Sequence, residues 1–517
     1  MIARRLLPVT VLVVALAASS CAGSSPLPTT VQAGGTSSAG TSSAVTSSPA
    51  ASSPASPQPG GRQPAPLVWR ACDDGFQCST LRVQLDDRDA SKGTFDLAVA
   101  RKRATSKQRI GSLLVNPGGP GASAIDFLED AYPSFPAQVR ARFDLVAFDP
   151  RGIGRSSAVR CATTAELDHY LSFDPSPTTP AALEAYAQAN RALDAGCAQR
   201  SGRILPYVGT DTVADDMDRV RAAVGDDKLT YLGYSYGTAI GAAYLDRHPT
   251  HVRAMVLDGA IDPTLSWEQL AGGQGIGFDR AMAAFLANCQ ATSCAYRQAV
   301  TGEIGAAYDR LAARVQRTAL PGLGSRTVGA GEFFMAVAGA LYSTSSWPAL
   351  ADALKAAEGG NGRRLLNLAD DFSERGPNGY APILESINAV NCIDRPWPRD
   401  VASYAAAGDR IVLQAPRFGR AIMVSGMSCL AWPVPPVSVP HRVTGLGAPP
   451  VIVIGTTRDP ATPFEWASGL AGQLQQGILI THRGDGHTVY RTGAPTCITG
   501  PVNAYLIDLV APTPFTC

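Results

Sequence analysis

The chain has 517 residues, of which 45% are hydrophobic and 17% charged, and its formal net charge at pH 7 is +1. This length allows a large buried core and exceeds that of one minimal domain. The balanced charge, with no block of basic residues, argues against nucleic acid or an anionic membrane surface as an electrostatic partner.

The N-terminus has the pattern of an export signal. Two arginines precede an apolar stretch over residues 6–18, which is too short to span a bilayer and suits the hydrophobic region of a signal peptide. Ala18-Ser-Ser-Cys21 then looks like a bacterial lipobox, although Ala18 stands where Leu or Val is usual. We expect residues 1–21 to be a signal peptide with Cys21 as the lipidated residue. Secretion after simple cleavage is the alternative.

Residues 22–66 are rich in Ser, Ala, Thr, Pro and Gly and contain almost no bulky apolar side chains. Such a segment cannot bury enough surface to fold, so we predict a disordered linker. Attached to a lipidated Cys21, this linker would hold the folded part away from the membrane.

The chain contains eleven cysteines, and ten of them follow Cys21. An even number in an exported chain suggests disulfide bonds, and the connectivity that we predict among the many possible ones is sequential. No two cysteines have the Cys-x2-Cys spacing of a zinc site, so neither a metal nor another cofactor is expected. The predicted pairs are Cys72–Cys78, Cys161–Cys197, Cys289–Cys294, Cys392–Cys429 and Cys497–Cys517.

Strand and helix patterns alternate after residue 67. Residues 79–85 and 94–101 alternate in polarity like an antiparallel pair. Residues 212–224 form a helical pattern, with Asp211 as the expected N-cap. The alternation predicts a mostly parallel sheet with helices on both faces. Further strands are expected at residues 110–115, 143–148, 229–233, 254–257, 451–454 and 478–481.

The loop after residues 110–115 reads Asn116-Pro-Gly-Gly-Pro-Gly121. Glycines between prolines form a rigid turn whose backbone can approach a ligand closely. An oxyanion hole needs such a backbone N–H group, and we expect Gly119 to supply it, with Gly118 as the alternative.

Gly233-Tyr-Ser235-Tyr-Gly237 stands between an apolar strand and a helical stretch of small residues. A serine between two glycines on a strand–turn–helix is the nucleophile elbow of an α/β-hydrolase. The pentapeptide also occurs in ordinary turns, so the flanking strand and helix decide the assignment. The N–H group of Tyr236 is then expected to be the other oxyanion donor.

The interval between Ser235 and the next predicted catalytic residue is far longer than a minimal hydrolase needs. Residues 263–443 contain several segments whose apolar positions recur with helical spacing. We predict a helical cap over the active site, inserted into a core formed by residues 67–262 and 444–517. The cap helices are expected at residues 278–288, 301–315, 331–341, 349–357 and 365–372.

The remaining triad members follow in the order Ser, Asp, His that this fold requires. Asp459 comes directly after the strand 451–454, and His487 follows the strand 478–481. His482 lies at the end of that strand and is the less favoured base, while Asp485 is too close to His487 to be the favoured acid. We also expect Thr462 to support Asp459.

Together these motifs resemble the prolyl-iminopeptidase-type serine peptidases, and more closely their secreted tripeptidyl-aminopeptidase branch in actinobacteria. The resemblance covers residues 67–517, and Pro117 stands where cytosolic members usually have His. The motifs are residues 116–121, residues 148–156 with the sequence Phe-Asp-Pro-Arg-Gly-Ile-Gly-Arg-Ser, residues 233–237, Asp459 and residues 484–488.

The resemblance implies an exported serine exopeptidase that releases short peptides, tripeptides above all, from free N-termini. Peptide or protein N-termini would be its substrates, and a lipid at Cys21 would join it to the outer face of the cytoplasmic membrane. Glu385 and Asp394, in a cap segment similar to that of the family, are expected to bind the substrate ammonium group.

Two other functions remain open at this point. A cell-envelope carboxylesterase or lipase would use the same triad below an apolar cap pocket. A binding lipoprotein without catalysis is disfavoured because every triad position is filled.

Overall fold

The structure is a computed structural model that describes residues 65–517. The predicted signal peptide 1–21, Cys21 and nearly all of the linker 22–66 lie outside the described residues.

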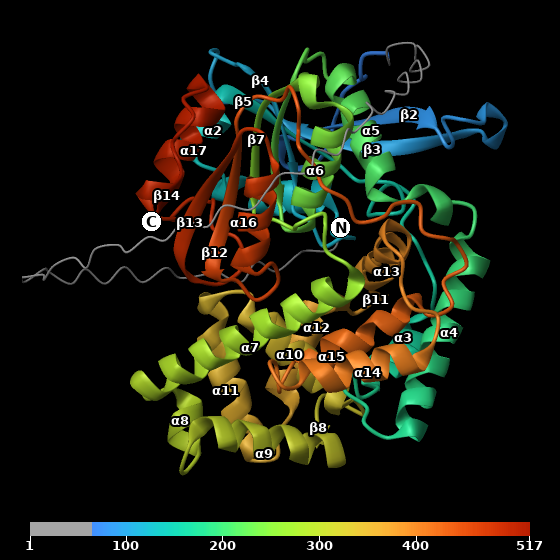
Figure 1. Cartoon of the computed structure of the whole chain (residues 1–517), viewed down its shortest axis with the longest axis vertical. Coiled ribbons are helices and arrows are strands. Elements are labelled where there is room, and N and C mark those ends of the chain that lie inside the picture. The colour runs from blue at the N-terminus through green and yellow to red at the C-terminus, as the bar shows by residue number, and fades with distance from the viewer. Residues whose placement is uncertain (1–64) are drawn as a thin grey trace, which may run out of the picture. The chain divides into compact units, whose positions relative to one another are not determined.

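A ten-stranded sheet forms the core, in the order β1-β2-β3-β5-β4-β6-β7-β12-β13-β14 (Figure 1). Strands β1 to β3 are antiparallel, and all pairs from β5 to β14 are parallel. The predicted strands are therefore present, and the fold is that of an α/β-hydrolase. The bounds are β1 Arg70–Ala71, β2 Gln77–Gln84, β3 Thr94–Lys102, β4 Gly111–Asn116, β5 Phe143–Phe148, β6 Leu229–Tyr234, β7 Val252–Asp258, β12 Val451–Arg458, β13 Gly477–Asp485 and β14 Phe515–Thr516.

Helices cover both faces of the sheet because successive strand residues point to opposite sides. Leu113 belongs to the same hydrophobic cluster as residues of α1, α2 and α17, whereas its neighbour Leu114 belongs to the cluster that includes residues of α5, α6 and α16. A parallel strand that is buried on both faces has a nearly continuous apolar sequence, as β5 has. The bounds are α1 Ala124–Ala131, α2 Ala137–Arg142, α5 Thr210–Ala223, α6 Tyr236–Arg247, α16 Phe464–Gln473 and α17 Thr496–Asp508.

Between β7 and β12, where the sequence predicts a cap, lies a helical insertion with a hydrophobic core of its own, called the cap below (Figure 1). Phe285, Leu311, Val337 and Leu354 from four of its helices meet in that core. The bounds are α7 Trp267–Ala291, α8 Ala295–Ala299, α9 Ile304–Arg317, α10 Ala330–Leu341, α11 Trp347–Glu358, α12 Arg363–Phe372, α13 Ile383–Asp394, α14 Val401–Ile411 and α15 Gly419–Ser425, with short hairpins β8 Leu320–Pro321/β9 Thr327–Val328 and β10 Arg375–Gly376/β11 Gly379–Tyr380.

Two helices that the sequence did not predict, α3 Thr164–Ser172 and α4 Pro180–Ser201, pack against this insertion rather than against the sheet alone. Tyr186 of α4 shares a cluster with Tyr404 of α14, because the apolar face of a long amphipathic helix needs a partner. None of the helices in the described part of the chain has both the length and the apolar character needed to cross a membrane.

The predicted N-cap of α5 is wrong. The helix begins two residues earlier, at Thr210, with Gly209 as its N-cap, and Asp211 lies in the first turn. Its negative charge still suits that position, since the helix dipole is positive there.

The Asp149-Pro-Arg151 segment stabilises the elements around the oxyanion loop. Asp149 accepts hydrogen bonds from the Ser123 hydroxyl and the Ile125 N–H group at the start of α1, directly after that loop. Arg151 is buried and forms a bidentate ion pair with Asp216 of α5, at 2.7 and 3.0 Å. A buried guanidinium needs such a partner, so this family motif has a structural role here.

Five disulfide bonds are present among residues 65–517, and they join the ten cysteines of that range in the sequential pairs that the sequence predicts. Cys497–Cys517 links α17 to the C-terminal residue after β14. Since β14 pairs with β13, this bond holds the C-terminus beside the strand that leads to His487.

Candidate active site

Ser235 lies in the turn between β6 and α6 with φ 54° and ψ −126°. This left-handed conformation is uncommon for a residue with a side chain, and it is typical of a nucleophile elbow. The two flanking glycines are required by close contacts. A Cβ atom on Gly233 would lie 2.5 Å from the Gly237 carbonyl oxygen, and one on Gly237 would lie 2.7 Å from the Asn116 carbonyl oxygen.

The oxyanion loop lies directly against this turn. A Cβ atom on Gly118 would come within 2.7 Å of the Tyr236 nitrogen. The Gly118 N–H group donates to Asn116 Oδ1 at 2.9 Å, and Gly118 is buried. Gly119 is exposed, and its N–H group makes no hydrogen bond within residues 65–517. The geometry therefore favours Gly119 over Gly118 as the donor beside Tyr236.

Asp459 and His487 follow the adjacent parallel strands β12 and β13 and meet at their carboxyl ends. His487 Nδ1 lies 2.9 Å from each carboxylate oxygen of Asp459, which is 2% exposed. The N–H groups of Ala461 and Thr462 and the Thr462 hydroxyl also donate to Asp459. This arrangement holds a proton on Nδ1 and leaves Nε2 as the basic nitrogen.

His487 Nε2 is buried and has no hydrogen-bond partner among the described residues. Burial by itself lowers the pKa of His487, but the charge and hydrogen bond of Asp459 and the charge of Asp258 outweigh burial, so the net shift is upward. Neutral His487 is the form that accepts a proton from a serine hydroxyl, so a raised pKa moves the acid limb of activity to higher pH.

Asp258, which was not predicted from the sequence, connects the nucleophile turn to the histidine loop. Its carbonyl oxygen accepts the Ser235 N–H group at 2.9 Å, while Oδ2 accepts the N–H groups of Val489 and Tyr490 at 2.8 and 2.7 Å. Its other carboxylate oxygen is buried without a partner in this part of the chain, and burial raises the pKa of Asp258 to about 6. In the sequence, Asp258 could have been recognised as a site residue because it stands at the end of a strand, β7, as Asp459 stands directly after β12.

Replacement of Asp258 by Asn is expected to move the acid limb of kcat/KM to lower pH by about half a unit or more. Asp258 is ionised above its pKa of about 6, and loss of this negative charge destabilises the His487 imidazolium and lowers its pKa. The amide oxygen can still accept the two N–H groups of the histidine loop. The pH profile of kcat/KM measures the shift, and an unchanged limb or one moved to higher pH contradicts the prediction.

The cap also reaches the catalytic histidine. The backbone N–H group of His487 donates to the carbonyl oxygen of Tyr342, which follows α10, at 2.8 Å. The ring of Tyr342 stands edge-on to the imidazole, with centroids 5.3 Å apart. Phe372 at the end of α12 packs on Tyr342 and is 40% exposed. These aromatic residues form a wall of the site that the sequence did not single out.

The alternative triad members have other partners. Asp485 forms a bidentate ion pair with Arg458, at 2.5 and 2.7 Å. His482 lies within β13 with its Nδ1 3.5 Å from the Thr456 hydroxyl, and burial lowers its pKa. Neither side chain shares a hydrogen bond with Ser235 or Asp459 in the described chain.

Glu385 and Asp394 of α13 do not lie as an ammonium site would require. Glu385 is 1% exposed, and its Oε1 accepts the N–H groups of Cys161 and Ala162. Both carboxylate oxygens of Asp394 accept from Thr210, by its N–H group at 2.8 Å and by its hydroxyl, and burial raises the pKa of Asp394 to about 6. These contacts give both acids structural roles, although Glu385 Oε2 is buried without a hydrogen-bond partner among the described residues.

One group of side chains among the described residues has the spacing of a possible metal site: Asp218, His248 and His251. Asp218 already binds Arg221 at 2.8 Å and the Tyr244 hydroxyl at 2.8 Å. The guanidinium charge opposes a cation at that position. None of these residues belongs to the turn or loops described above.

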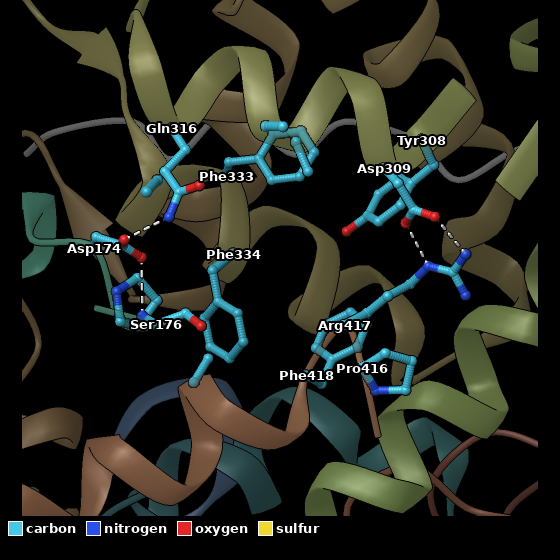
Figure 2. Close-up of a pocket in the computed structure, with 15 residues that line it drawn as sticks. Asp174, Ser176, Tyr308, Asp309, Gln316, Phe333, Phe334, Pro416, Arg417 and Phe418 are labelled. Carbon is cyan, nitrogen blue, oxygen red and sulfur yellow. Dashed lines mark hydrogen bonds and ion pairs between the residues drawn. The ribbon is translucent and has the colours of Figure 1, made fainter. Parts of the chain in front are cut away.

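A cavity of about 380 Å³ lies between the cap and residues 174–176, which precede α4, and none of the predicted catalytic residues lines it (Figure 2). Its polar groups bind one another, since Gln316 donates to Asp174 at 2.7 Å and Arg417 pairs with Asp309 at 2.7 Å. Its charged groups are engaged in these contacts and its lining contains no histidine that could activate Ser176, so this cavity offers no chemistry comparable to that of the strand ends.

Comparisons with known proteins give a consistent result. A family model described as the alpha/beta hydrolase fold matches residues 111–296, and one described as TAP-like protein matches residues 415–517. Serine protease Hip1 of Mycobacterium tuberculosis is 35% identical over 473 residues, which cover 86% of this chain and 90% of Hip1. Carboxylesterase B of the same species is 37% identical over 454 residues, which cover 85% and 86% of the two chains. Tripeptidyl aminopeptidase of Streptomyces coelicolor is 32% identical over 449 residues, which cover 83% and 81%.

Proposed function

We propose that this chain, which belongs to the α/β-hydrolase family with a TAP-like C-terminal region, releases short peptides, tripeptides above all, from free N-termini. The chain is a serine hydrolase of the peptidase type. The observation that best supports the proposal is the Asp459–His487 pair at the strand ends, held by Asp258 to the turn that presents Ser235.

In the proposed reaction Ser235 Oγ attacks the scissile carbonyl carbon while His487 Nε2 takes its proton. The N–H groups of Tyr236 and Gly119 stabilise the oxyanion. The C–N bond then breaks, His487 returns the proton to the leaving amine, and water hydrolyses the acyl-enzyme by the same route.

Tyr236 is positioned by more than the helix that it begins. Its hydroxyl lies 2.6 Å from the Thr210 hydroxyl, which in turn donates to Asp394. Asp394 therefore contributes to the site indirectly, because it fixes the residue whose N–H group faces the oxyanion.

A second activity, ester hydrolysis, is favoured by one specific observation, the 37% identity to carboxylesterase B. Both reactions use the same triad, so the difference depends on what the cap recognises. A peptidase that acts on free N-termini needs an accessible carboxylate near the site for the substrate ammonium group.

Glu374 is the cap carboxylate that fits this need. It has φ 52° in the turn between α12 and β10, is exposed, and forms no ion pair or side-chain hydrogen bond within the described region. It lies two residues after Phe372, whose ring packs on Tyr342 at 5.8 Å. Partial burial and the charge of Asp126, near the start of α1, raise the pKa of Glu374, as expected for a carboxylate without a cation.

A panel of one-, two- and three-residue amides with free or acetylated N-termini, together with matched esters, tests the function. We expect the free tripeptide amide to be the best amide substrate, with acetylation lowering kcat/KM at least about tenfold, because the ion pair between the substrate ammonium group and Glu374 is lost. Glu374→Gln is expected to cause a similar loss on the free amide and to spare the acetylated ester. Glu303→Gln, at an exposed cap position, is the matched control. Ester turnover without any amide turnover would favour the esterase instead.

We also infer that the chain is exported and joined to the membrane through a lipid on Cys21. The five disulfide bonds support export, since such bonds persist in oxidising compartments. The mass of the mature N-terminal peptide would distinguish a lipidated Cys21 from a plain cleaved end.

A further inference from the structure

We propose that a cavity of about 290 Å³ in the core is the binding site for the residue that follows the scissile bond, and that it selects a large apolar side chain there. This inference rests on the proposed function, because it assigns the leaving-group side of that same active site.

The cavity borders three catalytic elements at once. Pro117 of the oxyanion loop, Tyr234 directly before Ser235, and His487 all line it. The leaving amine has to come within hydrogen-bond distance of His487 Nε2 in order to take up the proton that came from Ser235. A space that is lined by His487 and by the residue next to the nucleophile therefore lies on the leaving-group side of the bond.

The lining chemistry defines the occupant. Phe127 of α1, Phe135 and Tyr490 face the cavity together with Tyr234. The Phe127 ring stands edge-on to both Phe135 and Tyr234, with centroids 6.0 and 5.9 Å apart. Aromatic walls in this arrangement suit an aromatic or large aliphatic side chain, whose burial is favourable and which requires no buried hydrogen bond.

The walls are held in place by hydrogen bonds between distant segments. The Tyr234 hydroxyl donates to the Tyr490 carbonyl oxygen at 2.8 Å, and the Thr492 N–H group donates to the Ser134 carbonyl oxygen at 2.6 Å. Asp258 fixes the same loop through the N–H groups of Val489 and Tyr490. A cavity with walls fixed in this way loses little entropy when it is filled, which is what a specificity site requires.

Arg491 supplies a positive charge at the rim. Its side chain is exposed and forms no ion pair or hydrogen bond with any other described residue, although it lines the cavity. When the leaving group is a single amino acid, its α-carboxylate lies next to the side chain that enters the cavity. The guanidinium then favours a free carboxylate over an amide at that position.

The wild-type enzyme tests the proposal with peptides that share one acyl part and differ only in the last residue: Gly, Leu, Phe and Phe amide. We expect kcat/KM for release of that residue to rise at least about tenfold from Gly to Phe. Phe acid should exceed Phe amide by about threefold or more. Equal kcat/KM for Gly, Leu and Phe would overturn the proposal.

Ala131, at the end of α1, also lines the cavity, and Ala131→Phe should fill it. We expect this variant to abolish the preference for Phe over Gly and to leave hydrolysis of a common acyl-enzyme unchanged, since the leaving group has already departed. Ala406→Phe, at an exposed position of α14, controls for the added bulk. A uniform loss on all peptides, equal to that of the control, would count against the cavity. Arg491→Gln should remove only the preference for acid over amide.

If the enzyme cleaves no peptide, the proposed function fails but the cavity can still be tested. Methyl and 3-phenylpropyl esters of one acyl group then replace the peptides, with the larger alcohol expected to react at least about tenfold faster in acylation. Equal acylation rates, or a preference that Ala131→Phe leaves intact, would overturn the assignment of the cavity while the triad is still active.

Discussion

Replacement of Ser235 by Ala is expected to lower kcat at least about 10³-fold on every peptide and ester substrate. The change removes the attacking oxygen but keeps the Cβ atom, so the strained turn at φ 54° bears no new backbone cost. The N–H groups of the oxyanion loop remain, which is why a residual rate above that of water is expected. Steady-state kinetics and labelling by a fluorophosphonate probe measure the loss.

Ser293 provides a matched control. It is another serine with positive φ, 49°, and it lies exposed in the turn between α7 and α8. Ser293→Ala is expected to keep activity and probe labelling, and both variants should unfold at nearly the wild-type temperature. Labelling of the Ser235→Ala protein at the wild-type rate would mean that another residue is the nucleophile.

The second large effect is expected for Asp459→Asn, with kcat reduced about 10³- to 10⁴-fold. One carboxylate oxygen of Asp459 accepts the N–H groups of Ala461 and Thr462. An amide NH₂ group at that position would face these two N–H groups without an acceptor, so it cannot lie there. The NH₂ group must then replace the other oxygen and face His487 Nδ1. That hydrogen bond puts the histidine proton on Nε2, and a protonated Nε2 cannot accept the proton of Ser235.

Asp485→Asn is the control for this variant, because Asp485 is the other acid near His487 in the sequence. Its carboxylate binds Arg458 at the surface, so its loss is expected to change kcat by less than about threefold. The pair of variants is compared at the same pH with the same substrates. A large loss for Asp485→Asn with a small one for Asp459→Asn would reverse the assignment of the acid.

Much of the fold could be predicted because the deciding features are close together in the sequence. The strand at 143–148 is predicted at its observed bounds, since six consecutive apolar or buried positions leave few alternatives. The nucleophile turn is visible because the strain at Ser235 and the crowding at Gly233 and Gly237 arise within five residues. Two of the five disulfide bonds likewise join cysteines only six and five residues apart.

The surroundings of Glu385 and Asp394 depend on contacts between distant segments. Glu385 and Asp394 were expected to face a substrate, but α13 directs them towards the backbone N–H groups of residues 161, 162 and 210, some 180 to 220 positions away. An acid on a helix has the same local pattern whether it binds a ligand or caps a neighbouring segment. Only the packing of that helix against the core decides between the two roles.

The sequence by itself determined the class of chemistry: an elbow serine, an acid after one strand and a histidine after the next, in the order that this sheet brings to one edge. The tertiary structure decided how those residues are held and what surrounds them. Asp258 links the nucleophile turn to the histidine loop, Tyr342 of the cap accepts the His487 N–H group, and Gly119 rather than Gly118 keeps a free donor. The physical reason is the distance along the chain over which each effect acts. Turn strain and strand periodicity act between chain neighbours and are visible in the sequence. Hydrogen bonds and burial between distant segments exist only after the helices and the sheet have packed.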